Sequence, residues 1–171
     1  MPGRVLRSGI TTEISHVKEN IRSQWLTGGW SVWRKDILVN NKHKEIKTKW
    51  AIAEDVIFSY PIGKVFPLYV CASAIISHND YPYDTDDKKW HFFHGRTQTI
   101  WNYHFVHRHK ELSRVLFFYT VFIRVFGKLI YGIITRRHDL VSFSHGAISA
   151  VAKIIKYFFT STPKSDLREF R

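Results

Sequence analysis

Cysteine is almost absent from the chain, since Cys71 is the single one in 171 residues. One cysteine cannot form an internal disulfide, which excludes a small secreted disulfide scaffold and a cysteine-based zinc finger. The same scarcity indicates a reducing compartment. Residues 1–20 also lack the apolar core of a signal peptide, so we expect no secretory leader.

Long apolar runs are missing too. In the most apolar segment, residues 110–134, the longest uncharged run covers only residues 115–123, whereas a membrane span needs about 20 apolar residues. At about 100° per residue, the cations of this segment fall on one narrow stripe of a helix. They are Lys110, Arg114, Arg124 and Lys128. This pattern predicts a helix lying in a membrane interface. Residues 145–159 predict a second such helix, and the alternative is a helical hairpin packed on the domain core.

Acidic residues are few, with 14 Asp and Glu against 26 Lys and Arg and a formal net charge of +12. The net charge is +6 over residues 1–50, −5 over residues 51–87 and +11 over residues 88–171. The length suits one domain, and the 44% hydrophobic content argues against disorder. The positive charge is compatible with nucleic acid or an anionic membrane as partner, and the acidic centre is a place to look for chemistry.

The acidic centre carries a helix signal followed by a strand signal. Glu54 and Asp55 precede an apolar stretch and predict the first turn of a helix, where the macrodipole favours carboxylates. We expect Pro61 and Gly63 to end this helix early. Residues 65–77 are rich in Val, Ile, Tyr and Phe and predict one or two short strands.

An aromatic, glycine-bearing segment lies upstream of this centre. Adjacent Gly28 and Gly29 permit the backbone to approach a ligand or another segment closely. Trp25, Trp30 and Trp33 surround them and suit either stacking on a sugar ring or packing in the core.

In order and spacing, these motifs resemble the C-terminal half of a family 2 glycosyltransferase of the rhamnosyltransferase-like type. The matching segments include Trp-Leu-Thr-Gly-Gly, Ser-Val-Trp-Arg-Lys and Ala-Glu-Asp-Val-Ile-Phe-Ser-Tyr. They cover residues 3–9, 25–29, 31–35, 53–60, 67–70, 74–78, 112–114 and 143–155. The resemblance thus extends over nearly the whole chain.

The resemblance implies a GT-A fold, an α/β nucleotide-sugar domain around a largely parallel sheet, here followed by amphipathic helices. In that family an Asp at the position of Asp55 is the general base that deprotonates the acceptor hydroxyl. An inverting transfer needs such a carboxylate within hydrogen-bond reach of the hydroxyl, opposite the departing diphosphate. Glu54 would orient the acceptor or support Asp55.

The resemblance also implies binding roles. Gly28 and Gly29 would let the backbone approach the acceptor or donor sugar, with Trp30 and Arg34 beside them. His78 matches a family position that completes the coordination of a divalent metal, Mg²⁺ or Mn²⁺, on the donor diphosphate.

The donor-binding half of the family pattern precedes the matched region, so we expect it to be encoded separately or lost by truncation, and the metal to bind only with it. Asp84-Thr85-Asp86 spells the metal-binding Asp-x-Asp of the family but follows His78, so we interpret it as coincidence. The expected organisation is an acceptor-side half over residues 1–106 and a basic amphipathic tail over residues 107–171.

The predicted function is therefore that of a partial glycosyltransferase, transferring sugar from a nucleotide-sugar donor to a cell-envelope polysaccharide or lipid-linked acceptor. The basic apolar tail predicts a peripheral, cytoplasmic location on anionic lipid at the inner face of the cell membrane. One alternative is a basic nucleic-acid-binding module, for which no recognised motif is present, so nucleic acid is the less favoured partner. The other is a membrane-surface protein without catalysis.

Overall fold

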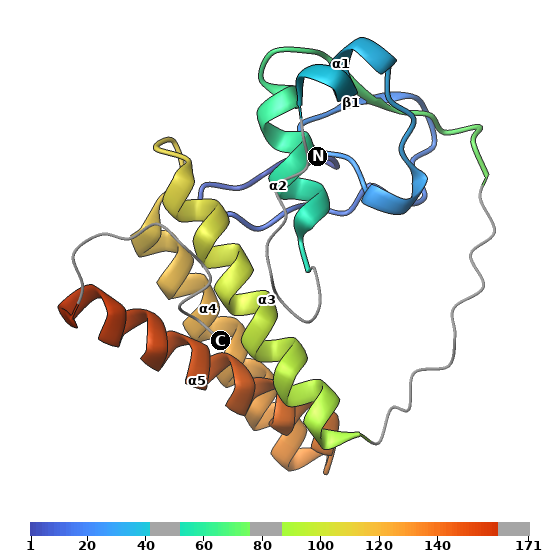
Figure 1. Cartoon of the computed structure of the whole chain (residues 1–171). Helices are drawn as coiled ribbons and strands as arrows, with labels where there is room; N and C mark the ends of the chain where they lie inside the picture. Colours follow the sequence, from blue (N-terminus) through green and yellow to red (C-terminus); the bar gives the residue numbers. More distant parts are fainter. Residues whose placement is uncertain (42–51, 76–86, 161–171) are drawn as a thin grey trace.

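The computed structural model of the chain describes residues 1–41, 52–75 and 87–160. Three long helices form one end of the molecule, and a lobe of short elements forms the other (Figure 1). The helices are α3 (Lys88–Arg108), α4 (Arg114–Ile134) and α5 (His138–Thr160). The lobe contains β1 (Ile21–Ser23), the 3-10 turn η1 (Gly28–Trp30), α1 (Lys35–Asn40), α2 (Glu54–Gly63) and β2 (Leu68–Val70).

The prediction of an α/β GT-A fold is wrong. Within the described ranges, the sheet is a single antiparallel pair in which Ile21 faces Val70 and Ser23 faces Leu68. A parallel sheet needs strands buried on both faces, whereas each strand here has three residues and an exposed central side chain. Pro67 lacks the backbone N–H for a longer ladder, and Cys71 beyond β2 is exposed.

The helix signal of the acidic centre is confirmed, and the helix ends at Gly63 as predicted, although Pro61 does not end it. α2 begins at Glu54 and continues through Pro61 to Gly63. Proline removes a hydrogen bond to the preceding turn, a loss that α2 tolerates near its C-terminal end, where Pro61 is exposed.

The apolar segment predicted as a helix is confirmed as α4, and the second amphipathic segment forms part of α5. The sequence pattern does not predict α3, because the buried face of this helix mixes aromatic residues with Gly95, Thr99 and His104 and shows no apolar period. Ser113 caps α4, since its hydroxyl accepts a hydrogen bond from the Leu116 N–H at 3.3 Å.

α3 and α5 cross at very short distance because each contributes a glycine. A Cβ on Gly95 would stand 2.1 Å from the Phe143 carbonyl oxygen, and one on Gly146 would stand 1.9 Å from the Phe92 carbonyl oxygen. Neither position can hold a side chain without separating the helices.

The main core joins the lobe to the helices. Val56 and Tyr60 of α2 are buried against α3, where the Tyr60 and Phe105 rings meet edge to face at 5.3 Å. The same cluster includes Tyr103, Val106, Leu112, Phe117 and Ile154. The predicted domain boundary after residue 106 stays a prediction, and residues on both sides of it share this core.

Candidate functional site

The two carboxylates of the proposed catalytic pair lie in the first turn of α2, as the sequence predicts. Both side chains are half-buried. The Asp55 carboxylate accepts a hydrogen bond from the Val56 N–H at 2.8 Å. Ala53 precedes them with φ +67°, in the left-handed region, and turns the chain into the helix.

The structure brings the glycine pair to this turn. A Cβ on Gly28 would lie 3.4 Å from the Asp55 Cβ, whereas Gly29 has open space around it. Ser59 fixes this approach, because its buried hydroxyl accepts from the Leu26 N–H at 2.9 Å and donates to the Asp55 carbonyl at 2.6 Å. The sequence analysis missed Ser59, whose spacing four residues after Asp55 was the available signal.

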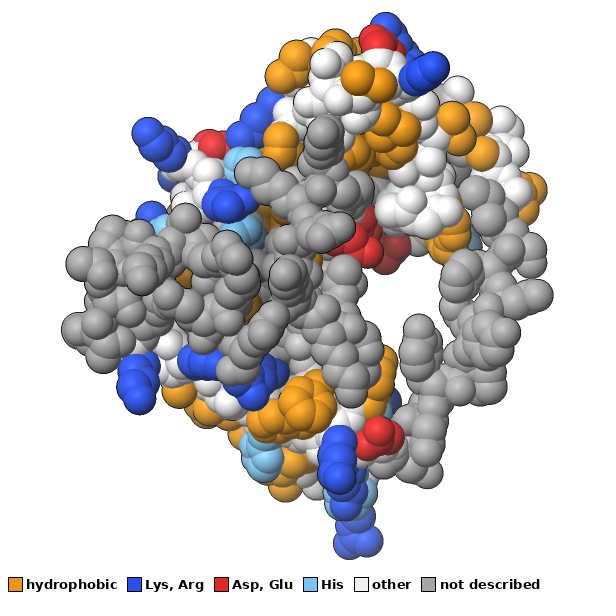
Figure 2. All heavy atoms as spheres, viewed as in Figure 1, with side chains coloured by type: hydrophobic (Ala, Val, Ile, Leu, Met, Phe, Trp, Pro, Cys, Tyr) orange, Lys and Arg blue, Asp and Glu red, His pale blue; other side chains and the backbone are white. Residues whose placement is uncertain are grey.

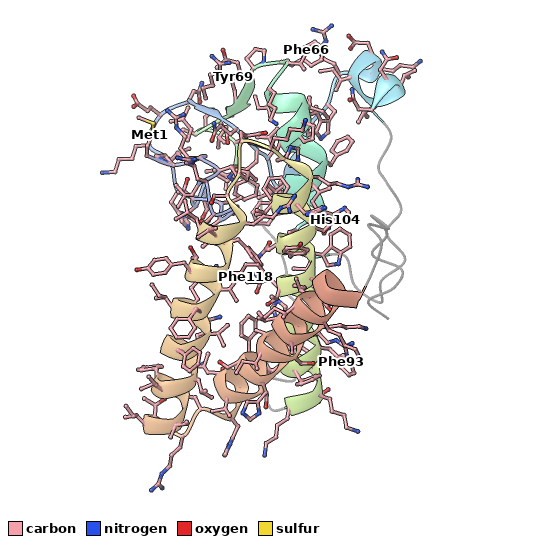
Figure 3. The ribbon with its side chains drawn as sticks, turned by 90° about the vertical axis from the view of Figure 1, so that its left-hand side faces the viewer. Met1, Phe66, Tyr69, Phe93, His104 and Phe118 are labelled. Carbon is pink, nitrogen blue, oxygen red and sulfur yellow. The ribbon has the colours of Figure 1, made fainter. Side chains whose placement is uncertain are left out.

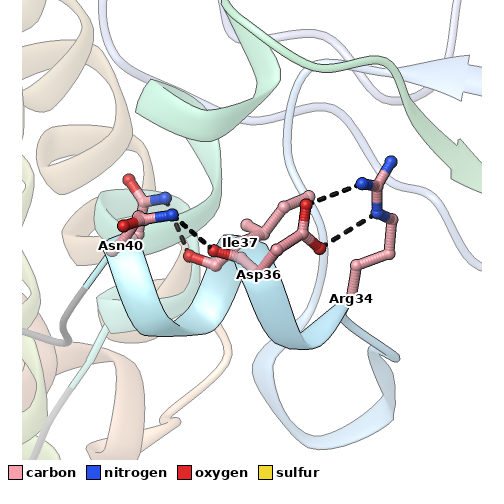
Figure 4. A network of polar contacts seen from close by, with 5 residues as sticks. Arg34, Asp36, Ile37 and Asn40 are labelled. Atoms are coloured by element: carbon pink, nitrogen blue, oxygen red, sulfur yellow. Dashed lines mark hydrogen bonds and ion pairs between the residues drawn. The ribbon is translucent and has the colours of Figure 1, made fainter.

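Trp30 and Arg34 lie on the segment that follows. Trp30 is 48% exposed at the end of η1. Arg34 precedes α1, and its guanidinium donates two hydrogen bonds to the Asp36 carboxylate (Figure 4). Nε lies 3.1 Å from Oδ1, and Nη2 lies 2.6 Å from Oδ2. Its charge is therefore already paired at the surface. Trp33 is half-buried, with its ring edge-on to Phe58 at 5.2 Å.

The metal prediction remains open. His78, Asp84 and Asp86 lie outside the described residues. Among the residues that are described, no three His, Cys, Asp or Glu side chains are grouped closely enough to hold an ion. His91 and His94 belong to α3 and pack around the Trp90 ring at 4.8 Å each.

α4 leaves one side apolar and uncovered, which we call the outer face of α4. Its nine residues are each at least 39% exposed, and at about 100° per residue they fall within an arc of about 120°. They are Val115, Leu116, Tyr119, Phe122, Ile123, Phe126, Ile130, Ile133 and Ile134. In Figure 3, side chains of α4 project away from α3 and α5, whereas Phe118 lies toward α3.

The cations of α4 lie outside this face, with Arg114 and Arg124 exposed and Lys128 half-buried. The Lys128 ammonium sits over the Phe143 ring of α5, 3.9 Å from its centroid. Arg124 borders a hollow between α4 and the N-terminal segment. On the inner side of α4, the Ser144 hydroxyl of α5 lies 3.2 Å from the Val125 carbonyl and is buried. α4 thus buries Phe117, Val125 and Gly132 against the molecule and leaves its outer face uncovered.

Of the helices in the described residues, α4 is the one that is long enough and apolar enough to cross a membrane, judged by length and composition alone. Its 21 residues span about 31 Å. Only 17% of its most apolar window is buried inside the molecule. This separates α4 from the covered core helix of a water-soluble domain.

On the face of the molecule seen in Figure 2, acidic side chains are few, and Lys, Arg and His side chains stand between separate hydrophobic patches. This distribution matches the basic composition of the chain.

A titratable cluster joins α2 to the turn between α3 and α4. Lys64 forms an ion pair with Glu111, and its ammonium lies 3.2 Å from the His109 Nδ1. Burial, then the nearby Glu111 charge, raises the pKa of Tyr60 to about 12. Burial, reinforced by the Lys64 charge, lowers the pKa of His109.

Comparisons with family models, with curated proteins and with solved structures found no match.

Proposed function

We propose that this protein works at a membrane surface, with the outer face of α4 lying in the lipid interface. The observation that carries the proposal is the uncovered outer face of α4. A helix of a soluble domain buries its apolar side. α4 buries Phe117, Val125 and Gly132 but leaves a second, wider apolar side exposed, with Phe122 59% exposed.

Lipid fits this face better than a protein groove because of the charges around it. Lys110 and Arg114 stand at one end of α4, and Arg136 and Arg137 stand at the other, all exposed. Cations flanking an apolar stripe are attracted to anionic headgroups while the stripe enters the acyl boundary. Since α4 also carries the exposed Arg124 and the half-buried Lys128 outside its outer face, we propose that the helix lies along the surface and does not cross it.

Replacing Phe122 by Asp tests this role. Full burial of a Phe side chain contributes about 1.5–3 kcal/mol, so loss of the ring should weaken vesicle binding about tenfold or more. Co-sedimentation of the full chain with vesicles of phosphatidylcholine and phosphatidylglycerol measures the change.

Phe93→Asp is the matched control, because Phe93 is an exposed Phe on another helix, 43% exposed on α3. It should bind vesicles like the unaltered protein. If the unaltered protein stays in the supernatant and sediments as a dimer instead, the outer face of α4 is covered by a second copy and the membrane proposal is wrong. A shift of DNA or RNA without vesicle binding would likewise overturn it.

Glycosyl transfer is a second candidate, favoured by the approach of Gly28 to Asp55. The backbone of Gly28 lies beside the half-buried Asp55 in the first turn of α2. The resemblance places the general base at this residue. A membrane-bound location would suit a lipid-linked acceptor.

The Asp55→Asn variant tests this second candidate. Transfer of labelled sugar from a nucleotide-sugar donor, with Mg²⁺ or Mn²⁺ and a separately produced donor-side half, should fall about a hundredfold or more when the base is lost. Glu13→Gln changes an exposed carboxylate far from Asp55 in the sequence and should leave the rate unchanged. Equal rates in Asp55→Asn would remove Asp55 from this role.

A further inference from the structure

A hollow that is open to solvent lies where the N-terminal segment meets α3 and α4. Its lining combines three apolar side chains with four polar ones. The polar members are Ser8, Asn102, Thr120 and Arg124, and no carboxylate lines it.

Three of these polar groups have no hydrogen-bond partner among the described residues: the Ser8 hydroxyl, the Asn102 amide and the Arg124 guanidinium. Ser8 is 8% exposed, Asn102 is half-buried and Arg124 is exposed. Thr120 differs, because its hydroxyl donates to the Leu116 carbonyl at 2.7 Å.

The turn that carries Ser8 is held firmly against α3. The Gly9 N–H donates to the Leu6 carbonyl at 2.8 Å, and the Leu6 N–H donates to the Ile10 carbonyl at 2.8 Å. Gly9 has φ +82°, and a Cβ there would stand 2.2 Å from a methyl carbon of Val106. Only glycine allows both this turn and this contact.

These groups are donors of the kind that an anion needs. A hydroxyl, an amide NH₂ and a guanidinium together offer neutral and charged hydrogen bonds, and Arg binds phosphate oxygens through paired N–H groups. The positive charge of Arg124 is not cancelled, since it has no ion-pair partner in the described part of the chain.

The hollow also borders the outer face of α4. At about 100° per residue, Thr120 and Arg124 follow Leu116, an edge residue of that face, by about 40° and 80° around the helix. We propose that the hollow binds a phosphate group, supplied by a membrane lipid whose acyl chains lie against the outer face of α4. This inference deepens the proposed membrane function and rests on it.

The test uses two uncharged variants, Ser8→Ala and Asn102→Ala, so that general electrostatic attraction is unchanged. Co-sedimentation is measured with phosphatidylcholine vesicles made equally negative by phosphatidylglycerol or by oleate, whose charge is a carboxylate. A hydrogen bond to a charged group corresponds to about tenfold in affinity. Each variant should bind the phosphatidylglycerol vesicles about tenfold more weakly and the oleate vesicles as before.

Gln98→Ala is the matched control, because Gln98 is an amide one turn from Asn102 on α3 that does not line the hollow. It should bind both vesicles normally. If the unaltered protein binds neither vesicle, the proposed membrane function fails. If it binds both and the two variants match it, the membrane function stands and the phosphate site is wrong.

Inorganic phosphate and glycerol 3-phosphate, followed by calorimetry, separate the two sources of phosphate. We expect both soluble anions to bind weakly to the unaltered protein, and their heat of binding to disappear in Ser8→Ala. This result supports a site that is completed by lipid. Tight binding of either soluble anion would overturn the assignment to lipid.

Discussion

Three histidines, of which His94 and His109 are half-buried and His107 is exposed, make the stability of this protein depend on pH. Burial lowers the pKa of His94, His107 and His109, and nearby cations lower each further. Around His109 these charges are Lys64 and Arg108, which oppose Glu111. Because the Lys64 ammonium is a donor, its contact with Nδ1 requires the neutral ring.

We expect the protein to lose stability as the pH falls below the ordinary histidine pKa of 6.5. The folded pKa values lie below the unfolded ones, so the unfolded chain binds more protons in that interval. The stabilisation is complete above 6.5 and is lost as the pH falls through the folded values. Thermal unfolding between about pH 8 and about pH 5 should show a falling Tm.

His109→Gln should flatten part of this slope, because it removes one of the three titrating rings. His16→Gln, at an exposed position, should leave the slope as it is. A Tm that rises on acidification would contradict the assignment.

At single positions, the sequence predicted the role of a residue where that role depends on its near neighbours in the chain. Glu54 and Asp55 begin α2 as predicted, because acidic residues before an apolar stretch suit a helix start. It could not indicate that Gly28 lies against Asp55 or that Ser59 ties the two segments, since both depend on contacts distant along the chain.

Among the elements, α4 was predictable and α3 was not. α4 has strong amphipathic periodicity, with its cations on one stripe. α3 carries Gly95, Thr99 and His104 on its buried face, which blurs the helical period. Pairing of α3 with α5 is fixed by Gly95 and Gly146, whose role appears only when the two helices are side by side.

Gly146→Ala should destabilise the fold by about 3 kcal/mol, since its Cβ would overlap the Phe92 carbonyl and force the helices apart. Gly127→Ala is the contrasting change in α4, where a Cβ meets nothing within 4 Å. It should stabilise the fold by about 0.5–1 kcal/mol, because alanine favours the helix more than glycine does.

Chemical denaturation of both variants measures these differences in the free energy of unfolding. Equal stability of Gly146→Ala and the unaltered protein would mean that the α3–α5 crossing is looser than the structure has it.

For the molecule as a whole, the sequence predicted apolar helices near the C-terminus but assigned the wrong fold class. The strand prediction over residues 65–77 rested on composition, yet β2 has three residues, with Tyr69 63% exposed. Composition cannot reveal whether a short apolar segment finds partner strands. The core instead forms where α2, α3, α4 and α5 meet, through Val56, Phe105, Phe117 and Ile154.

The two sides of α4 differ in how much change of shape they tolerate. The inner side must match rigid neighbours, as at Gly132, where a Cβ would lie 3.0 Å from Leu140. In the proposed membrane contact, the outer side meets lipid, which has no fixed contour. We therefore expect Ile, Leu, Val and Phe to be interchangeable at Ile123 or Ile130, whereas the inner side of the same turns should tolerate little change of shape.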